Sequence, residues 1–255
     1  MKRYILHLGY CGKNYHGWQR QPGVISVQEQ LEDCLEKLVE PGIQLIGAGR
    51  TDTGVHATTF FAHFDCSREF PSPAQARQLV YRMNRFLPAD IVIYALYEAQ
   101  ADFHARFSAI SRKYTYHISL AKNPFKQDFC YTLQGKLNLE AMNTACTFLQ
   151  QYSDFSCFSK SHTQTKTNNC VIRKARWIQK GDTIIFEIEA NRFLRNMVRA
   201  IVGTMLEIGQ NKMQPEAIHT IIQSGDRGTA GVSVPAKGLF LDHVEYPGQL
   251  MKKLS

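Results

Sequence analysis

The order of apolar periodicities along this chain constrains its fold more than any single residue does. Period-2 alternation marks strands and 3.6-residue periodicity marks helices. The first half predicts strands at 4–10, 44–49, 58–66 and 90–98 and helices at 26–38 and 73–86. The first helix has a local start signal, because Glu29 follows Ser26 at the capping-box spacing. The resulting order, β-α-β-β-α-β, is that of ferredoxin-like domains.

The second half repeats the same order. It predicts strands at 113–120, 171–179, 183–190 and 239–246 and helices at 138–151, 192–208 and 215–223. Lys180-Gly181-Asp182 is a hairpin signal between the two middle strands. We therefore expect an α/β (α+β) protein of two tandem ferredoxin-like domains, 1–104 and 105–255, with a central antiparallel sheet. A cleft between the halves is the natural place for a ligand.

A glycine-rich loop carries the strongest chemical signal. Residues 47–57 read Gly-Ala-Gly-Arg-Thr-Asp-Thr-Gly-Val-His-Ala and place Asp52 inside a glycine-bracketed turn. Glycine lacks the Cβ that would block a sharp turn or the close approach of another molecule. Arg50 would favour the ionised form of Asp52 and keep it available as a nucleophile or base. The pattern favours a reactive carboxylate.

Other interpretations of this loop differ in how well they fit. An Asx-turn or helix cap, in which Asp52 only bonds the nearby backbone, fits the local composition. A dinucleotide fingerprint needs a third glycine where Asp52 stands, and a Walker loop needs Gly-Lys followed by Ser or Thr. The spacing therefore excludes both phosphate-binding loops.

Composition and charge narrow the class of protein. The 255 residues carry a formal net charge of +8, which indicates a polyanionic partner such as nucleic acid. No apolar run approaches the roughly 18 residues that span a bilayer, so no membrane association is expected. Seven cysteines without a Cys-x-x-Cys pair argue against a disulfide framework and a zinc site, and favour a cytoplasmic protein with reduced thiols. Positive charge gathers at 13–20, 106–113, 160–176 and 192–199.

Two of these basic regions leave alternatives open. In the helix predicted at 192–208, Arg192, Arg195 and Arg199 share one face, which is either solvated or in contact with phosphates. Arg195 adjoins the apolar stripe, and a partly buried guanidinium would need an anionic partner. The polar segment 159–169 fits an RNA-contact loop and equally a solvent loop without a role.

Five motifs together resemble the TruA family of tRNA pseudouridine synthases. They lie, in order and over nearly the whole chain, at 10–21, 49–57, 103–116, 191–199 and 234–239. Residues 49–57, Gly-Arg-Thr-Asp-Thr-Gly-Val-His-Ala, match the nucleophile loop of that family. Cys11 stands where the family usually carries Asp, and we expect only a local change at the edge of the substrate loop.

The resemblance implies roles for individual residues. Asp52 would be the catalytic carboxylate, as nucleophile or base, and Arg195 would pair with it. Arg50 would help to extrude or replace the target base, and Tyr114 would stack against or position the uracil. Tyr116, on the same strand, we take as structural. RNA contacts are expected at Arg20, Arg106 and Arg199.

The implied reaction isomerises uridine to pseudouridine in the anticodon stem-loop of tRNA, at positions 38, 39 and 40, by a homodimer. The base leaves its ribose carbon, turns and reattaches through a ring carbon, so neither a metal nor a nucleotide cofactor is expected. Three routes stay open for Asp52: attack on the ribose, attack on the base, or removal of a ribose proton. The alternative is a non-catalytic RNA-binding protein on the same fold. A small-molecule lyase or hydrolase fits the basic composition poorly.

Overall fold

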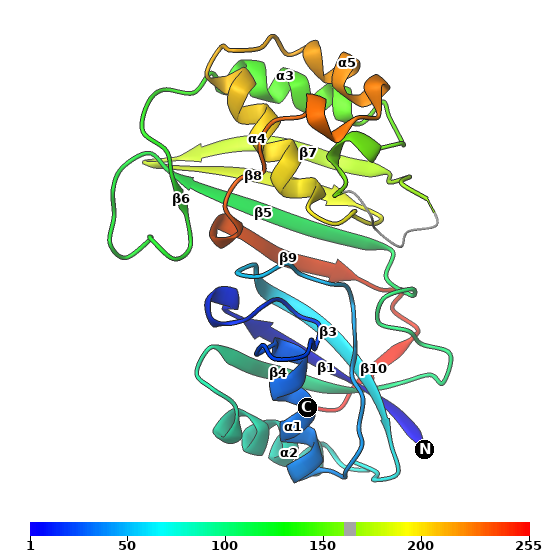
Figure 1. The fold of residues 1–255 in the computed structure, drawn as a ribbon. Helices are drawn as coiled ribbons and strands as arrows, with labels where there is room; N and C mark the ends of the chain where they lie inside the picture. The colour runs from blue at the N-terminus through cyan, green and yellow to red at the C-terminus, as the bar shows by residue number, and fades with distance from the viewer. Residues whose placement is uncertain (161–166) are drawn as a thin grey trace. The chain divides into compact units, whose positions relative to one another are not determined.

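The computed structural model describes residues 1–160 and 167–255, and the chain divides into two compact units (Figure 1). Met1–Ile110 and Leu241–Ser255 form the first unit, and Ser111–Phe240 form the second. The first unit extends to Ile110, whereas the sequence predicts a domain boundary after residue 104. The C-terminal segment groups with the first unit because β10 (Met251–Lys253) pairs antiparallel with β4 (Ile91–Ala99). Within the predicted RNA-contact loop at 159–169, residues 161–166 lie outside the described residues.

The first unit is an antiparallel sheet with two helices on one face (Figure 1). Its other elements are β1 (Lys2–Tyr10), α1 (Val27–Leu38), β2 (Ile46–Gly47), β3 (His56–Cys66) and α2 (Pro73–Phe86). The strand order is β10-β4-β1-β3, and β2 pairs with β3. The first four strands of the unit therefore have the neighbours expected of a β-α-β-β-α-β domain.

The helices of the first unit begin within one residue of their predicted starts. The Ser26 hydroxyl accepts a hydrogen bond from the Glu29 amide at 3.3 Å and caps α1. Val27 and Leu31 on the apolar stripe of α1 are fully buried. Ser72 caps α2 in the same way, which confirms both predicted helices.

β2 is shorter than the strand predicted at 44–49. It contains only Ile46–Gly47, because Leu45 bonds to side chains of α1 instead of a neighbouring strand. The Leu45 amide donates to Glu32, and the Leu45 carbonyl accepts from Gln28. Side-chain hydrogen bonds here replace the ladder that an alternating pattern would suggest.

The second unit also carries its helices on one face of its strands (Figure 1). Its elements are β5 (Ser111–Ser119), β6 (Tyr131–Thr132), α3 (Leu139–Leu149), β7 (Ile172–Lys180), β8 (Thr183–Ala190), α4 (Met197–Gly209) and α5 (Ala217–Ser224). The order β5-β8-β7 is antiparallel, and the short β6 pairs parallel with β5. β9 (Leu239–Glu245) begins in this unit, and its residues from Leu241 belong to the first. The predicted α/β class with mostly antiparallel strands is confirmed.

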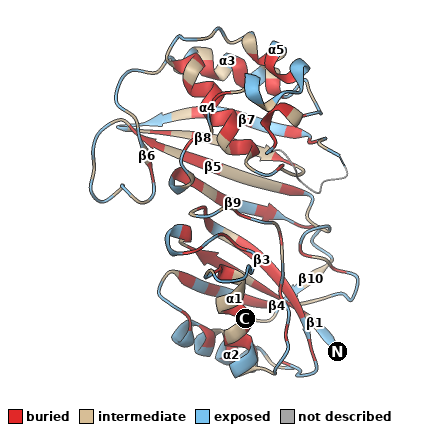
Figure 2. Cartoon of the chain, viewed as in Figure 1, coloured by how far each residue is buried: buried red, intermediate tan, exposed pale blue. Residues whose placement is uncertain are grey.

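The start of α4 differs from the prediction of a helix at 192–208. Asn196, immediately before the helix, has a left-handed backbone with φ 67°, so a continuous helix from 192 is wrong. Its side-chain amide donates to the Ser233 hydroxyl at 2.6 Å, which fixes this conformation from outside the helix. From Met197 onward the helix is buried along nearly its whole length, as Figure 2 shows. No helix among the described residues is long and apolar enough to cross a membrane.

Candidate active site

Asp52 lies in the loop between β2 and β3 of the first unit and is half-buried. The loop turns through its main chain, because the Asp52 carbonyl accepts a hydrogen bond from the Val55 amide at 3.1 Å. Gly54, inside this turn, has φ 78°, a conformation that favours glycine. The glycine at this position therefore shapes the loop that carries the carboxylate.

The segment after β1, residues 11–21 and called the first segment below, packs against the Asp52 loop. The Thr51 carbonyl accepts from the Trp18 amide at 3.3 Å, and the Tyr15 carbonyl accepts from the Gly54 amide at 3.3 Å. The hydroxyls of Tyr10 and Thr51 are hydrogen-bonded at 2.9 Å. Two motifs that are separate in the sequence therefore form one structure around Asp52.

Two glycines of the first segment permit this close packing. A Cβ on Gly17, whose φ is 88°, would lie 2.3 Å from the Thr51 carbonyl oxygen. A Cβ on Gly12 would lie 2.0 Å from the Val55 carbonyl oxygen. The Gly12 amide also donates to Nδ1 of the buried His56 at 3.1 Å. This bond gives His56 a structural role.

The first segment is anchored on its other side by Asp90. The Tyr15 hydroxyl donates to Oδ1 of Asp90 at 2.5 Å, and the Asn14 amide donates to Oδ2 at 3.0 Å. The Asp90 carbonyl accepts from the Cys11 amide at 2.8 Å. Burial, together with the hydrogen bond to Asp90, raises the pKa of Tyr15 well above its usual range. Tyr15 therefore stays protonated as a donor.

Trp18 provides an apolar contact for the chain that enters the Asp52 loop. Its ring stacks on Phe60 of β3, with centroids 4.2 Å apart, and is almost completely buried. A Cβ on Gly47 would lie 2.6 Å from the Trp18 indole, so this glycine lets the indole approach the main chain. The chain entering the Asp52 loop is thus held against a large aromatic side chain.

The arginines of the first unit occupy different surroundings. Arg50 is exposed, two residues before Asp52. Arg106 is exposed beside Phe107, a residue that is 76% exposed, and its guanidinium carbon lies 5.6 Å from the ring centroid. Arg20 instead forms ion pairs with two carboxylates of α1, which lie at Glu29 and Glu32.

The second unit carries Tyr114 on β5. Its ring is half-buried and meets Phe193 edge-on, with centroids 5.1 Å apart. Tyr116 on the same strand is fully buried, and its hydroxyl donates to the Pro235 carbonyl at 2.8 Å. The contrast agrees with the interpretation of Tyr116 as structural and leaves Tyr114 with a partly accessible ring.

Arg195 precedes α4 and is exposed, so the partial burial that the sequence left open for it does not occur. The reason is the left-handed Asn196, which places Arg192 and Arg195 outside the helix. Arg199 lies within the helix, and its Nε donates to the Val234 carbonyl at 2.7 Å. The three arginines therefore do not form one helical face.

Sequence reasoning missed four residues that fix the segments next to the Asp52 loop. They are Gln28 and Glu32 on α1, Tyr15 in the segment after β1, and Asp90 immediately before β4. A weak signal existed at Glu32, since a carboxylate directly after Leu31 borders the apolar stripe of a predicted helix. Tyr15 and Asp90 carry no spacing signal, because 75 residues separate them.

Sequence similarity places this chain among enzymes that modify tRNA. A model of the tRNA pseudouridine synthase family matches residues 152–247. A tRNA pseudouridine synthase A of Parabacteroides distasonis is 47% identical over 98% of both chains. Proteins of the same name from Azobacteroides pseudotrichonymphae and Francisella tularensis subsp. holarctica are 46% and 40% identical, over 99% and 97% of this chain and 100% and 95% of theirs. The chain belongs to the tRNA pseudouridine synthase family, and these relatives give no support to a non-catalytic alternative.

Proposed function

We propose that this protein isomerises uridine to pseudouridine in the anticodon stem-loop of tRNA, at positions 38, 39 and 40. The observation that carries the proposal is the half-buried Asp52 on a loop framed by Gly54 and packed against the first segment. A pure RNA-binding surface has no need of a carboxylate held in this way. Relatives named tRNA pseudouridine synthase A, similar over nearly their whole length, support the same activity.

The chemistry divides among three further side chains. The target base must leave the helical stack before a carboxylate can reach it, at a cost of a few kcal/mol. Tyr114 offers a partly accessible ring on which the flipped uracil stacks. Arg195 is the proposed ion-pair partner of Asp52, and Arg50 the proposed replacement for the extruded base. Asp52 acts as nucleophile or base on the loosened nucleoside.

In this proposal, the protein binds RNA mainly through electrostatic attraction to its phosphates. The net charge of +8 favours binding to phosphates. Arg106 and Arg199 are the proposed contacts, and Arg20 contributes less because Glu29 and Glu32 already pair with it. We further propose a homodimer in the cytoplasm, where the seven unpaired cysteines would stay reduced.

Mapping of pseudouridine in a tRNA transcript tests the target positions. The transcript carries uridine at 38, 39 and 40, and a matched transcript carries cytidine at these three positions. After incubation, carbodiimide modification and primer extension should stop at the three uridines of the first transcript only. Stops elsewhere with none at these positions would contradict the assigned target.

The proposed homodimer has its own test. Light scattering of the purified protein should give twice the chain mass of 29.1 kDa.

A further inference from the structure

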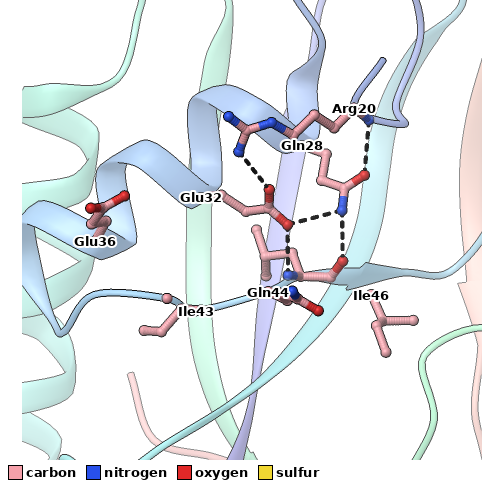
Figure 3. Close-up of a pocket in the computed structure, with 9 residues that line it drawn as sticks. Arg20, Gln28, Glu32, Glu36, Ile43, Gln44 and Ile46 are labelled. Carbon is pink, nitrogen blue, oxygen red and sulfur yellow. Dashed lines mark hydrogen bonds and ion pairs between the residues drawn. The ribbon is translucent and has the colours of Figure 1, made fainter. Parts of the chain in front are cut away.

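Helix α1 carries two polar side chains, Gln28 and Glu32, one turn apart. Together they bond to two segments next to the Asp52 loop, at residues 18–20 and at Leu45. Figure 3 shows Gln28 and Glu32 reaching from α1 toward Arg20 on one side and the chain at residues 44–46 on the other. The spacing of four residues places both side chains on the same face of the helix. The two side chains are therefore positioned to act together.

Glu32 bonds to both segments through its carboxylate. Oε1 accepts from the Leu45 amide at 2.9 Å and from the Gln28 side-chain amide at 2.9 Å. Oε2 accepts from Nη1 of Arg20 at 3.3 Å. Glu32 is only 8% exposed. A carboxylate this deeply buried is destabilising unless charge and hydrogen bonds compensate it, so all three contacts matter.

Gln28 completes the same network. Its side-chain amide donates to the Leu45 carbonyl at 3.0 Å, and its side-chain oxygen accepts from the Arg20 amide at 3.0 Å. The Gln28 main-chain amide donates to the Trp18 carbonyl at 2.9 Å. Both hydrogen-bonding groups of Leu45 and the chain at 18–20 are thus fixed against α1.

One fixed segment precedes the proposed catalytic loop along the chain, and the other is hydrogen-bonded to it. Leu45 precedes β2, from which the chain enters the loop of Asp52. Trp18 donates its amide to Thr51, the residue before Asp52, and its ring packs over Gly47. A shift of either segment would move the loop that carries the carboxylate.

We propose that Glu32 is a positioning residue for Asp52. Its carboxylate fixes Leu45 and Arg20 against α1, so the loop of Asp52 keeps one place relative to β3. Glu32 acts through these segments and touches neither the RNA nor the reacting atoms. The inference rests on the proposed catalytic role of Asp52.

The chain offers a matched control on the same helix. The network forms one wall of a cavity of about 520 Å³, which Glu36 also lines (Figure 3). Glu36 is exposed and lies one turn beyond Glu32. Glu36→Gln therefore removes a carboxylate from the same helix and the same cavity wall without touching Leu45 or Arg20.

The test measures single-turnover pseudouridine formation at saturating tRNA, at a temperature where circular dichroism shows each variant fully folded. Glu32→Ala should lower the rate constant roughly 10- to 100-fold, since misplacement of a reacting group by about 1 Å can cost 100-fold. The tRNA dissociation constant should stay within about threefold. Glu32→Gln keeps an acceptor for Leu45 but loses the ion pair with Arg20, so its rate should fall by roughly 3- to 10-fold. Glu36→Gln should match the native protein.

A purely structural role would lower the melting temperature and leave the rate of the folded protein unchanged. A Glu32→Ala rate within twofold of native, or a loss confined to tRNA affinity, would overturn the proposal. If Glu32→Ala does not fold, a Glu32→Gln rate equal to that of Glu36→Gln would overturn it. Asp52→Ala distinguishes failure of the proposed function from failure of this inference. Full activity of Asp52→Ala would contradict the catalytic role of Asp52. An inactive Asp52→Ala together with a normal rate for Glu32→Ala would contradict only the role of Glu32.

Discussion

The backbone of Gly17 lies so close to Thr51 that a Cβ on Gly17 would approach the Thr51 carbonyl oxygen to 2.3 Å. Thr51 directly precedes Asp52, so this contact sets how the first segment supports the catalytic loop. Gly17 also has φ 88°, which side chains rarely adopt. Space and backbone conformation both require glycine at this position.

Gly17→Ala should therefore lower the free energy of unfolding by more than the backbone penalty alone. Gly23 provides the control, because it has φ 74° but no atom within 4 Å of an added Cβ. Gly23→Ala should lower the free energy of unfolding by about 1–2 kcal/mol. Gly17→Ala should lower it further and reduce activity, since the Thr51 carbonyl must move. Urea denaturation and single-turnover assays check this, and equal costs at both positions would contradict it.

Stability should fall in mild acid because of His63. Burial, with smaller effects of the positive Arg3 and His104, lowers the pKa of His63 from 6.5 to about 4. Its Nδ1 accepts from the Ala105 amide at 3.1 Å, which requires the unprotonated nitrogen. Between pH 6.5 and 4 the unfolded chain binds a proton that the folded chain excludes, so the free energy of unfolding decreases as the pH falls.

The contribution of His63 is fully present above pH 6.5 and is lost by about pH 4. Its size is on the order of 3 kcal/mol. Urea denaturation from pH 8 to 4 should give a steeper loss for the native protein than for His63→Gln, whose side chain does not titrate. Parallel pH profiles of the two proteins would contradict the assignment.

Local signals predicted the elements whose ends are fixed by neighbouring residues. The start of α1 at Val27 follows from Ser26 and Glu29, three residues apart. Long-range contacts decided the rest. β2 is short because Glu32, thirteen residues away, binds Leu45. α4 starts late because Ser233, 37 residues away, accepts from Asn196.

The distinction between local signals and long-range contacts also applies to the candidate site. The glycine pattern around Asp52 is local, so the sequence could indicate the loop and its carboxylate. The support of that loop by Gly17 and by Glu32 depends on contacts between separate segments, which periodicity does not encode. The exposure of Arg195 was missed for the same reason, because it depends on the turn at Asn196.

The aromatic ring of Tyr114, more than its hydroxyl, should matter for catalysis. Stacking of a base on an aromatic ring is worth about 1–3 kcal/mol, which corresponds to roughly 5- to 150-fold. Tyr114→Ala should lower single-turnover activity by a factor in this range, and Tyr114→Phe should recover most of it. Tyr81→Ala serves as the control, because Tyr81 is 65% exposed on α2. Equal activity of the Ala and Phe variants of Tyr114 would argue against stacking.

The exposed Arg106 and the paired Arg20 should differ in their effect on tRNA binding. A cation that contacts phosphate contributes about one unit to the slope of log affinity against log salt. Arg106→Ala should reduce that slope by about one. Arg20→Ala should change it less, since Glu29 and Glu32 already compensate its charge. Filter binding over a series of salt concentrations measures both slopes, and a larger change for Arg20→Ala would reverse the assignment.

Release of tritium from tRNA labelled at C5 of uridine tests the central claim most directly, because the new bond to ribose displaces the label from that carbon. The native protein should release tritium from the anticodon stem-loop without added metal or nucleotide. Asp52→Asn, which keeps the size of the side chain, should release none while binding tRNA with unchanged salt dependence. Release by Asp52→Asn at the native rate would contradict the assignment of Asp52 as the catalytic carboxylate.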